Sequence, residues 1–144
     1  MKLETNSPQS ISILFVEDDG DILEILSSIL AVKFPDITLY TAINGRLGLE
    51  LFKVHTPVIV ITDINMPVMC GVQMTENIRA IKPESMIIAI TSKSGVTGVS
   101  EESIICNSDG KVAEFDHVIV KPVDLSELCG VIEQYIGEIK QRVS

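Results

Sequence analysis

Short apolar runs alternate with amphipathic stretches along most of the chain, a pattern typical of proteins in which strands and helices alternate. The runs begin near residues 11, 37, 58, 86 and 117, and each interval suits one strand, one helix and their connections. They predict strands at Ser10–Val16, Ile37–Ala42, Val58–Ile61, Met86–Ile90 and His117–Val120. The fold class is therefore α/β, a doubly wound five-stranded parallel sheet with helices on both faces.

Apolar residues at helical spacing lie between these runs and after the last one. They predict helices at about Asp21–Lys33, around Leu47–Phe52 as far as His55, at Val72–Ile81, and from a capping box at Asp124–Glu127 to about Gln141. The segment Ser92–Glu114 is harder to interpret, because it holds several glycines and serines around one apolar island, Ile104–Cys106. A weak helix is expected somewhere within it. Residues 1–9 are expected to be a flexible leader, and residues 10–144 a single domain.

The bulk properties exclude several classes of protein. The net charge of −9 disfavours direct binding to nucleic acid, because phosphate backbones would be repelled. No apolar run reaches the roughly 18–20 residues that a membrane-spanning helix needs, and the first ten residues lack a signal-peptide core. Cys70, Cys106 and Cys129 are odd in number and widely spaced, unlike a disulfide framework or a zinc site. Reduced thiols in a cytoplasmic protein are expected.

Polar side chains follow the carboxyl ends of four predicted strands, and these ends meet at one edge of a parallel sheet. The first strand delivers Glu17 and Asp18, the third Asp63, the fourth Thr91 and the fifth Lys121. Three neighbouring carboxylates repel one another unless a cation intervenes, and oxygen ligands suit Mg²⁺. An ionised Asp63 flanked by a divalent cation, an amine and a hydroxyl is suited to attack phosphorus. The product would be an aspartyl phosphate.

Each of these residues also has an ordinary structural role. Asp63 could start a turn or cap the next helix, and Asp18, Asp19 and Asp21 could serve the positive end of the first helix. For Asp19 and Asp21 the helix role is preferred. Thr91 alone is an unremarkable strand end, and Lys121 followed by proline could simply end a strand. The functional interpretation rests on the whole set occurring at successive strand ends.

The motifs that carry this set resemble the receiver domain of two-component response regulators, the CheY-like superfamily. They are Phe15–Asp19, Thr62–Gly71, Ile90–Ser92 and Val120–Pro122, and the resemblance runs from about Ser10 to Ile139. It implies a flavodoxin-like fold with strand order 2-1-3-4-5. It also implies a phosphorelay switch, phosphorylated by a sensor histidine kinase or a histidine phosphotransfer protein and acting on an unknown protein target. Such a domain catalyses only its own phosphotransfer and dephosphorylation.

The resemblance assigns a role to each site residue. Asp63 is the phosphoacceptor, and Thr91 and Lys121 contact the phosphoryl group. Asp18 and Asp63 bind Mg²⁺ directly, together with the backbone carbonyl of Asn65, whereas Glu17 acts through water. The bond between Lys121 and the following proline is expected to be cis, which only a proline permits readily.

The chain also departs from the family pattern. Val118 occupies the position, three residues before the lysine, where an aromatic residue usually reports phosphorylation, and His117 lies beside it. Thr91 and Lys121 are 30 residues apart, longer than usual, with the extra residues in Ser92–Asp109. Phosphorylation is expected to alter this long segment and the partner-binding face. Cys70 replaces the more usual Asp or Asn, with little expected chemical consequence.

Three other functions were considered. A receiver that has lost its chemistry would be an interaction module independent of phosphorylation, but the complete set of site residues argues against such loss. A phosphatase of the haloacid-dehalogenase kind would carry its nucleophile on the first strand and its acidic pair late, the reverse of the order seen here. A dinucleotide-binding protein would have Gly-x-Gly-x-x-Gly where this chain has Glu17–Gly20.

Overall fold

The structure is a computed structural model, and it describes residues 11–64, 66, 69, 71–91, 103–105 and 112–143. Strands and helices alternate over most of this range. The strands are β1 (Ser12–Val16), β2 (Thr38–Ala42), β3 (Ile59–Asp63), β4 (Met86–Thr91), β5 (Ser103–Ile105), β6 (Val112–Glu114) and β7 (His117–Val120). The helices are α1 (Gly20–Lys33), α2 (Gly45–His55), α3 (Gly71–Ile81) and α4 (Leu125–Val143).

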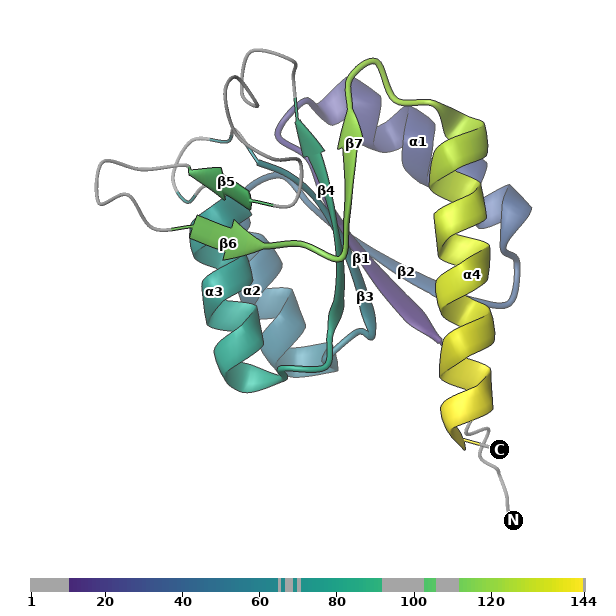
Figure 1. The fold of residues 1–144 in the computed structure, drawn as a ribbon. Coiled ribbons are helices and arrows are strands. Elements are labelled where there is room, and N and C mark those ends of the chain that lie inside the picture. The colour runs from purple at the N-terminus through teal and green to yellow at the C-terminus, as the bar shows by residue number, and fades with distance from the viewer. Residues whose placement is uncertain are drawn as a thin grey trace.

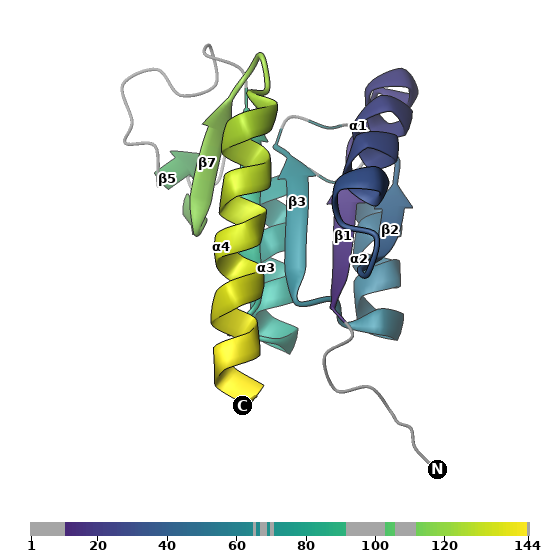
Figure 2. The same cartoon turned by 90° about the vertical axis from the view of Figure 1, so that its right-hand side faces the viewer.

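Five of the strands form one parallel sheet in the order β2-β1-β3-β4-β7. These are the five strands expected from the sequence, and their order is the predicted 2-1-3-4-5. Helices α1 and α4 cover one face of the sheet, whereas α2 and α3 cover the other, so the fold has three layers (Figures 1 and 2). The doubly wound architecture is therefore confirmed.

Alternation along the strands divides the apolar residues between two cores. In β1, Ile13 and Phe15 pack on the side of α1 and α4, whereas Leu14 and Val16 pack on the side of α2 and α3. This follows from the two-residue period of a strand, which directs successive side chains to opposite faces. A strand covered on both faces has no polar side, which explains the unbroken apolar runs in β3 and β4.

Side-chain caps define the starts of the helices. The carboxylate of Asp19 accepts hydrogen bonds from the backbone amides of Asp21 and Ile22, at 3.0 and 3.2 Å, and so caps α1. The preferred helix role of Asp19 is confirmed, and Asp21 lies in the first turn. Asp124 caps α4 in the same manner through the amides of Ser126 and Glu127, at 2.9 and 3.2 Å. These bonds satisfy amides that have no partner within the helix.

The prediction of a weak helix within Ser92–Glu114 is wrong for the described part of that segment. Its described residues form the strands β5 and β6, which pair antiparallel with Ile104 opposite Ala113. The physical reason is local sequence: β5 is Ser-Ile-Ile and β6 begins with valine, and β-branched side chains favour strands over helices. Three-residue apolar islands are also too short to nucleate a helix by themselves.

Several smaller predictions can be compared with the structure. The peptide bond between Lys121 and Pro122 is cis, as the resemblance implied. Cys129 is a buried free thiol, whereas Cys70, Cys106 and the leader at residues 1–9 lie outside the described residues. Among the described helices, none has both the length and the hydropathy that crossing a bilayer requires.

Candidate functional site

The site lies at the carboxyl edge of the sheet, where β1 and β3 each end in an acidic residue. Glu17 follows the last residue of β1, and its backbone amide donates to the carbonyl of Ala42 at 3.0 Å, which holds it beside β2. Asp18 continues into the turn before α1. Asp63 is the final residue of β3, and the amide of Ile64 donates to the carbonyl of Ile90 at 3.0 Å. Backbone contacts of the sheet therefore position Glu17 and Asp63, and Asp18 follows Glu17 in the chain.

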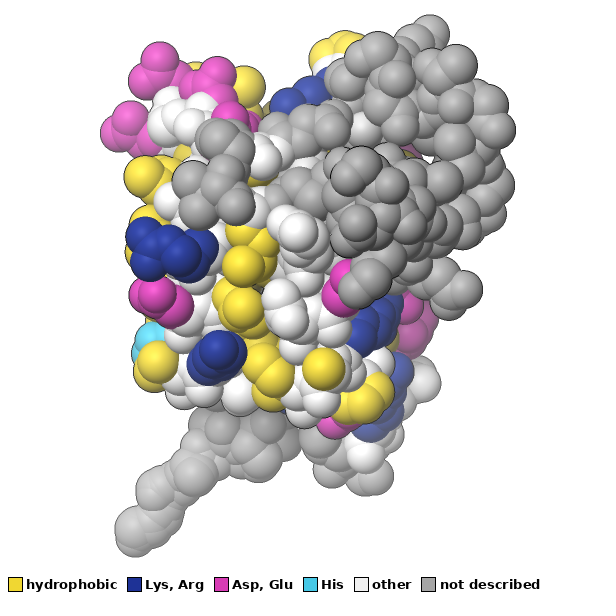
Figure 3. All heavy atoms as spheres, turned by 90° about the vertical axis from the view of Figure 1, so that its left-hand side faces the viewer, with side chains coloured by type: hydrophobic (Ala, Val, Ile, Leu, Met, Phe, Trp, Pro, Cys, Tyr) yellow, Lys and Arg dark blue, Asp and Glu magenta, His cyan; other side chains and the backbone are white. Residues whose placement is uncertain are grey.

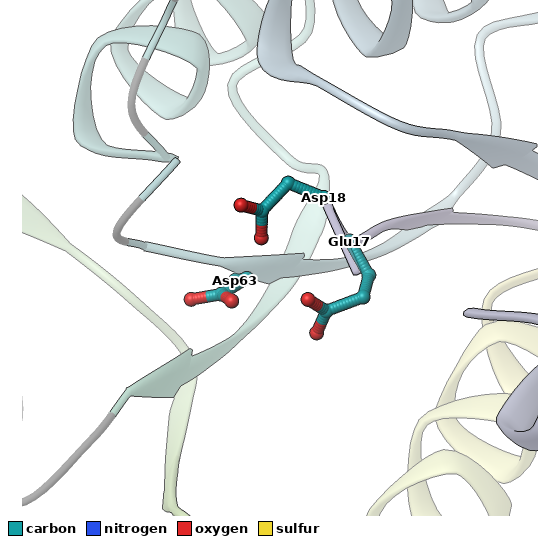
Figure 4. Close-up of side chains that lie close together, drawn as sticks. All are labelled: Glu17, Asp18 and Asp63. Atoms are coloured by element: carbon teal, nitrogen blue, oxygen red, sulfur yellow. The ribbon is translucent and has the colours of Figure 1, made fainter. Parts of the chain in front are cut away.

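Glu17, Asp18 and Asp63 converge although 45 residues separate the second from the third. Each offers a carboxylate oxygen, and the three oxygens lie within 4.8 Å of one another (Figure 4). Glu17 is 1% exposed and Asp63 is 4% exposed, whereas Asp18 is open to solvent. The clustering expected from the sequence is thus observed for these three residues.

Lys121 enters the same site from the end of β7. Its ammonium group donates a hydrogen bond to Oδ2 of Asp63 at 3.0 Å and forms an ion pair with it. Its backbone amide donates to the carbonyl of Thr91 at 2.7 Å. Thr91 is fully buried as the last residue of β4 and is paired with Val120 in the sheet. The strand ends expected to deliver Asp63, Thr91 and Lys121 therefore lie side by side.

The electrostatics of the site show an excess of negative charge. Burial raises the pKa of Glu17 from 4.5 to about 7, and the negative charge of Asp63 also raises it. The hydrogen bond from the Asp19 amide and the positive charge of Lys121 lower this pKa but do not outweigh the burial. For Lys121, burial acts to lower the pKa, but the hydrogen bond to Asp63 and the surrounding carboxylates raise it overall. Among the described residues, Lys121 thus faces three carboxylates, and a bound cation would relieve their repulsion.

The donor set fits a magnesium ion. All three groups offer oxygen, which Mg²⁺ prefers, and the exposed side of Asp18 leaves room for the waters that Mg²⁺ usually retains. A bound cation would lower the pKa of Glu17, which burial and then the charge of Asp63 raise. Asn65, whose backbone carbonyl was expected to complete the ligand set, lies outside the described residues, so its role stays a prediction.

Two features of the site were not recognised in the sequence. A Cβ atom on Gly71 would lie 2.7 Å from the carbonyl oxygen of Asp63 and 2.9 Å from Cα of Ile64, so only glycine permits this close approach. In the sequence, Gly71 was the last residue of the motif Thr62–Gly71, with no role of its own assigned. In addition, Ile22 and Ile25 contributed to the helical spacing that predicted α1, but they are 36% and 59% exposed.

These exposed isoleucines border a mostly apolar hollow of about 260 Å³ directly beside the acidic cluster. Its lining consists of Glu17, Ile22, Ile25, Leu26, Lys121, Pro122 and Val123. Leu26 still packs in the core, so α1 has apolar residues on both its inner and its outer face. The outer residues could have been found by noticing that the eight apolar residues of this helix exceed what one face can bury.

Comparison with known proteins decides the family. A model of the response regulator receiver domain matches residues 13–133, most of the chain. The chain belongs to the response regulator receiver domain family. This confirms the resemblance on which the site residues were assigned, and it makes the chain a signalling domain of two-component systems.

Relatives of this receiver domain are much longer proteins. The regulatory protein AtoC of Escherichia coli is 31% identical over 122 residues, which are 85% of this chain and 24% of AtoC. Hybrid signal transduction histidine kinase G of Dictyostelium discoideum is 33% identical over 132 residues, which are 90% of this chain and 4% of that kinase. The chain therefore spans a quarter or less of the length of these two relatives.

Solved structures agree with the fold. The N-terminal domain of an uncharacterized protein from Wolinella succinogenes is 29% identical, with a TM-score of 0.72, covering 94% of this chain and all of that domain. The response regulator TrrA from Thermotoga maritima, solved in complex with Mg²⁺-BeF, is 27% identical with a TM-score of 0.69. That comparison covers 86% of this chain and 97% of TrrA.

Proposed function

We propose that this receiver domain, taken as residues 10–144, is a phosphoacceptor switch in a His-to-Asp phosphorelay, with Asp63 as the acceptor. The observation that carries the proposal is the convergence of Glu17, Asp18 and Asp63 within 4.8 Å, with Lys121 on Asp63 at 3.0 Å. Asp63 is buried at the end of β3 and pairs with Lys121, a position that suits a carboxylate that must attack phosphorus.

The transfer follows from the chemistry of these residues. A carboxylate oxygen of Asp63 forms a bond to the phosphorus of a phosphohistidine while the bond from phosphorus to the imidazole nitrogen breaks, and the imidazole then takes a proton. Lys121 balances charge on the phosphoryl oxygens, and Thr91 supplies a hydroxyl donor to them. Glu17, Asp18 and Asp63 would hold Mg²⁺, with the Asn65 carbonyl; the bound ion would neutralise negative charge on the transferring group.

The donor of the phosphoryl group is a sensor histidine kinase or a histidine phosphotransfer protein. The hollow beside Lys121, bordered by the exposed Ile22 and Ile25, offers apolar surface for such a partner directly next to Asp63. The net charge of −9 supports a protein target rather than nucleic acid, and cytoplasmic localisation agrees with this role. Phosphorylation of Asp63 then alters the long segment after β4 and the partner-binding face.

The test is phosphorylation with acetyl phosphate and Mg²⁺, read by intact mass. The wild type is expected to gain one phosphoryl group that is stable in acid and labile in base, and this gain should disappear when Mg²⁺ is withheld. Asp63→Asn should abolish the gain completely, because an amide oxygen is a poor nucleophile.

Asp21→Asn is a matched control, since it removes an exposed acidic group from the first turn of α1 without touching the site. It should be phosphorylated like the wild type. A phosphoryl gain that persists in folded Asp63→Asn would contradict the proposal. A folded wild type that takes no phosphoryl group would favour the alternative, an interaction module that works without phosphorylation.

A further inference from the structure

Strands β5 and β6 form a two-stranded ribbon that is separate from the five-stranded sheet whose edge carries the site. It lies outside the sheet on the side of α2 and α3, and β6 packs against α3 (Figure 1). In the sequence it falls between Thr91 and Lys121, two of the proposed site residues. An isolated hairpin is only marginally stable, so this ribbon depends on what it packs against.

Helix α3 begins in contact with the acceptor. The amide of Gly71 donates to the carbonyl of Ile64 at 2.9 Å. The Cα of Gly71 approaches the backbone of Asp63 so closely that a Cβ there would lie 2.7 Å from the Asp63 carbonyl oxygen. The first turn of α3 thus has little freedom to move independently of Asp63.

The last turn of α3 is joined to the chain that leaves the ribbon. Arg79 donates to the carbonyls of Pro83 and Ser85, at 3.1 and 2.7 Å, and to Oδ2 of Asp116 at 3.0 Å. Asp116 comes two residues after the end of β6. The same Oδ2 accepts the amide of Ile87 at 2.7 Å, and the amide of Asp116 donates to the carbonyl of Ile87 at 2.9 Å.

The face that carries α2 and α3 has a hydrophobic band between charged side chains (Figure 3). Phe115, between β6 and Asp116, is buried in the core beneath this face. Val118 also packs against that core, and a valine cannot swing between buried and exposed positions as a large aromatic side chain does. A signal from Asp63 to this face therefore needs a route other than a swinging aromatic residue at position 118.

We propose that α3 is this route: it couples the state of Asp63 to the β5–β6 ribbon, and Arg79 is the positioning residue that joins the two by holding Asp116. The proposal rests on the proposed function, because it needs Asp63 to change its chemical state. An 11-residue helix is a nearly rigid element about 16 Å long. A shift at its first turn is thus carried to Arg79 and, through Asp116, to the base of the ribbon.

The experiment compares hydrogen exchange of the ribbon amides, residues 103–105 and 112–114, before and after phosphorylation with acetyl phosphate and Mg²⁺. In the wild type, phosphorylation is expected to change their exchange rates at least threefold. Arg79→Met should take the same phosphoryl group but lose most of this change. Asp116→Asn, which keeps an oxygen for the Ile87 amide but loses the charge, tests the same link with less risk to folding.

Arg46→Met is the matched control, because Arg46 lies on the neighbouring helix α2 and forms an exposed ion pair with Glu50. It should respond like the wild type. Two results would overturn the coupling while leaving the switch intact: a phosphorylated wild type whose ribbon does not respond, or variants at Arg79 and Asp116 that respond fully. Failure of the wild type to gain a phosphoryl group would overturn the proposed function and the coupling together.

Discussion

Two ion pairs lie at opposite edges of the sheet, and each has a nitrogen-to-oxygen distance of 3.0 Å. Lys121 and Asp63 pair at the carboxyl edge, and Arg79 and Asp116 pair at the amino edge. Their surroundings differ. Asp63 has two more carboxylates within 4.8 Å, whereas Asp116 also accepts the backbone amide of Ile87 and faces the guanidinium group of Arg79.

The difference separates an arrangement that serves chemistry from one that serves architecture. At the amino edge every acceptor described above has a donor, so the pair fixes α3 to β4 and β7. At the carboxyl edge, the described residues bring three carboxylates to one lysine, an excess of negative charge that a divalent cation would balance. Unbalanced charge costs stability in the absence of ligand, and such a cost is common at functional sites.

The largest effect should come from neutralising Glu17 in the absence of divalent cations. The pKa of Glu17 is raised to about 7 in the folded protein, so folding favours its protonated form. The stability that this residue contributes is therefore fully present below about pH 4.5 and is lost as the pH rises through 7. Glu17→Gln should therefore raise the free energy of unfolding at pH 8 by up to about 3 kcal/mol, and by less at pH 5. Urea unfolding in a chelator at both pH values measures this. A variant less stable than the wild type at pH 8 would refute the charge imbalance.

Removing the carboxylate at the amino edge should have the opposite sign. Asp116→Ala leaves the Ile87 amide and the Arg79 guanidinium group without their acceptor, and should lower the free energy of unfolding by about 2 kcal/mol. The same urea titration is the measurement. Asp116→Asn keeps an acceptor for the amide and should lose less. Equal losses for the two variants would mean that the charge of Asp116, and not the bond to Ile87, is what matters.

Magnesium should offset part of the excess negative charge at the carboxyl edge of the sheet. At a concentration ten times its dissociation constant, it should stabilise the wild type at pH 8 by about 1.4 kcal/mol. Asp18→Asn removes one expected ligand, and a reduced stabilisation in this variant is the predicted result. Thermal unfolding with increasing Mg²⁺ provides the measurement. An unchanged response in Asp18→Asn would exclude Asp18 from the ligand set.

The smallest effect should come from an ion pair with no buried partner. Arg46 and Glu50 are 59% and 61% exposed in their side chains, so water and salt screen their attraction. Arg46→Ala should change the free energy of unfolding by less than about 0.5 kcal/mol. A loss as large as that of Asp116→Ala would show that the distance between the charged groups, and not their burial, determines how much these ion pairs contribute to stability.

Much of the fold was predictable because the signals that specify it are local. The five sheet strands, their order and the four described helices were expected, and the observed bounds differ from the predicted ones by two residues or fewer at most ends. Asp63 was also correctly expected at a strand end. In the segment Ser92–Glu114 a weak helix was expected, but the described residues 103–105 and 112–114 form strands. Ile104 and Ile105 form too short an apolar island to distinguish a strand from a helix by periodicity.

The outer face of α1 shows a second limit of prediction from sequence. Helical spacing correctly indicated a helix, and Leu23, Leu26 and Leu30 do face the core. It did not indicate that Ile22 and Ile25 point outward, because apolar residues on two faces of one helix leave the core-facing side undecided by sequence alone. Which residues were buried depended on where β1 and α4 lie relative to α1.

By itself the sequence determined which residues stand at the strand ends, which side chains alternate between the two cores, and what chemistry the acidic residues, the threonine and the lysine are able to perform. Only the tertiary structure decided which of these groups meet. Lys121 reaches Asp63 across 58 positions of sequence, and Arg79 reaches Asp116 across 37. The physical reason is that such contacts depend on how strands pair and helices pack, whereas periodicity and capping act over a few residues.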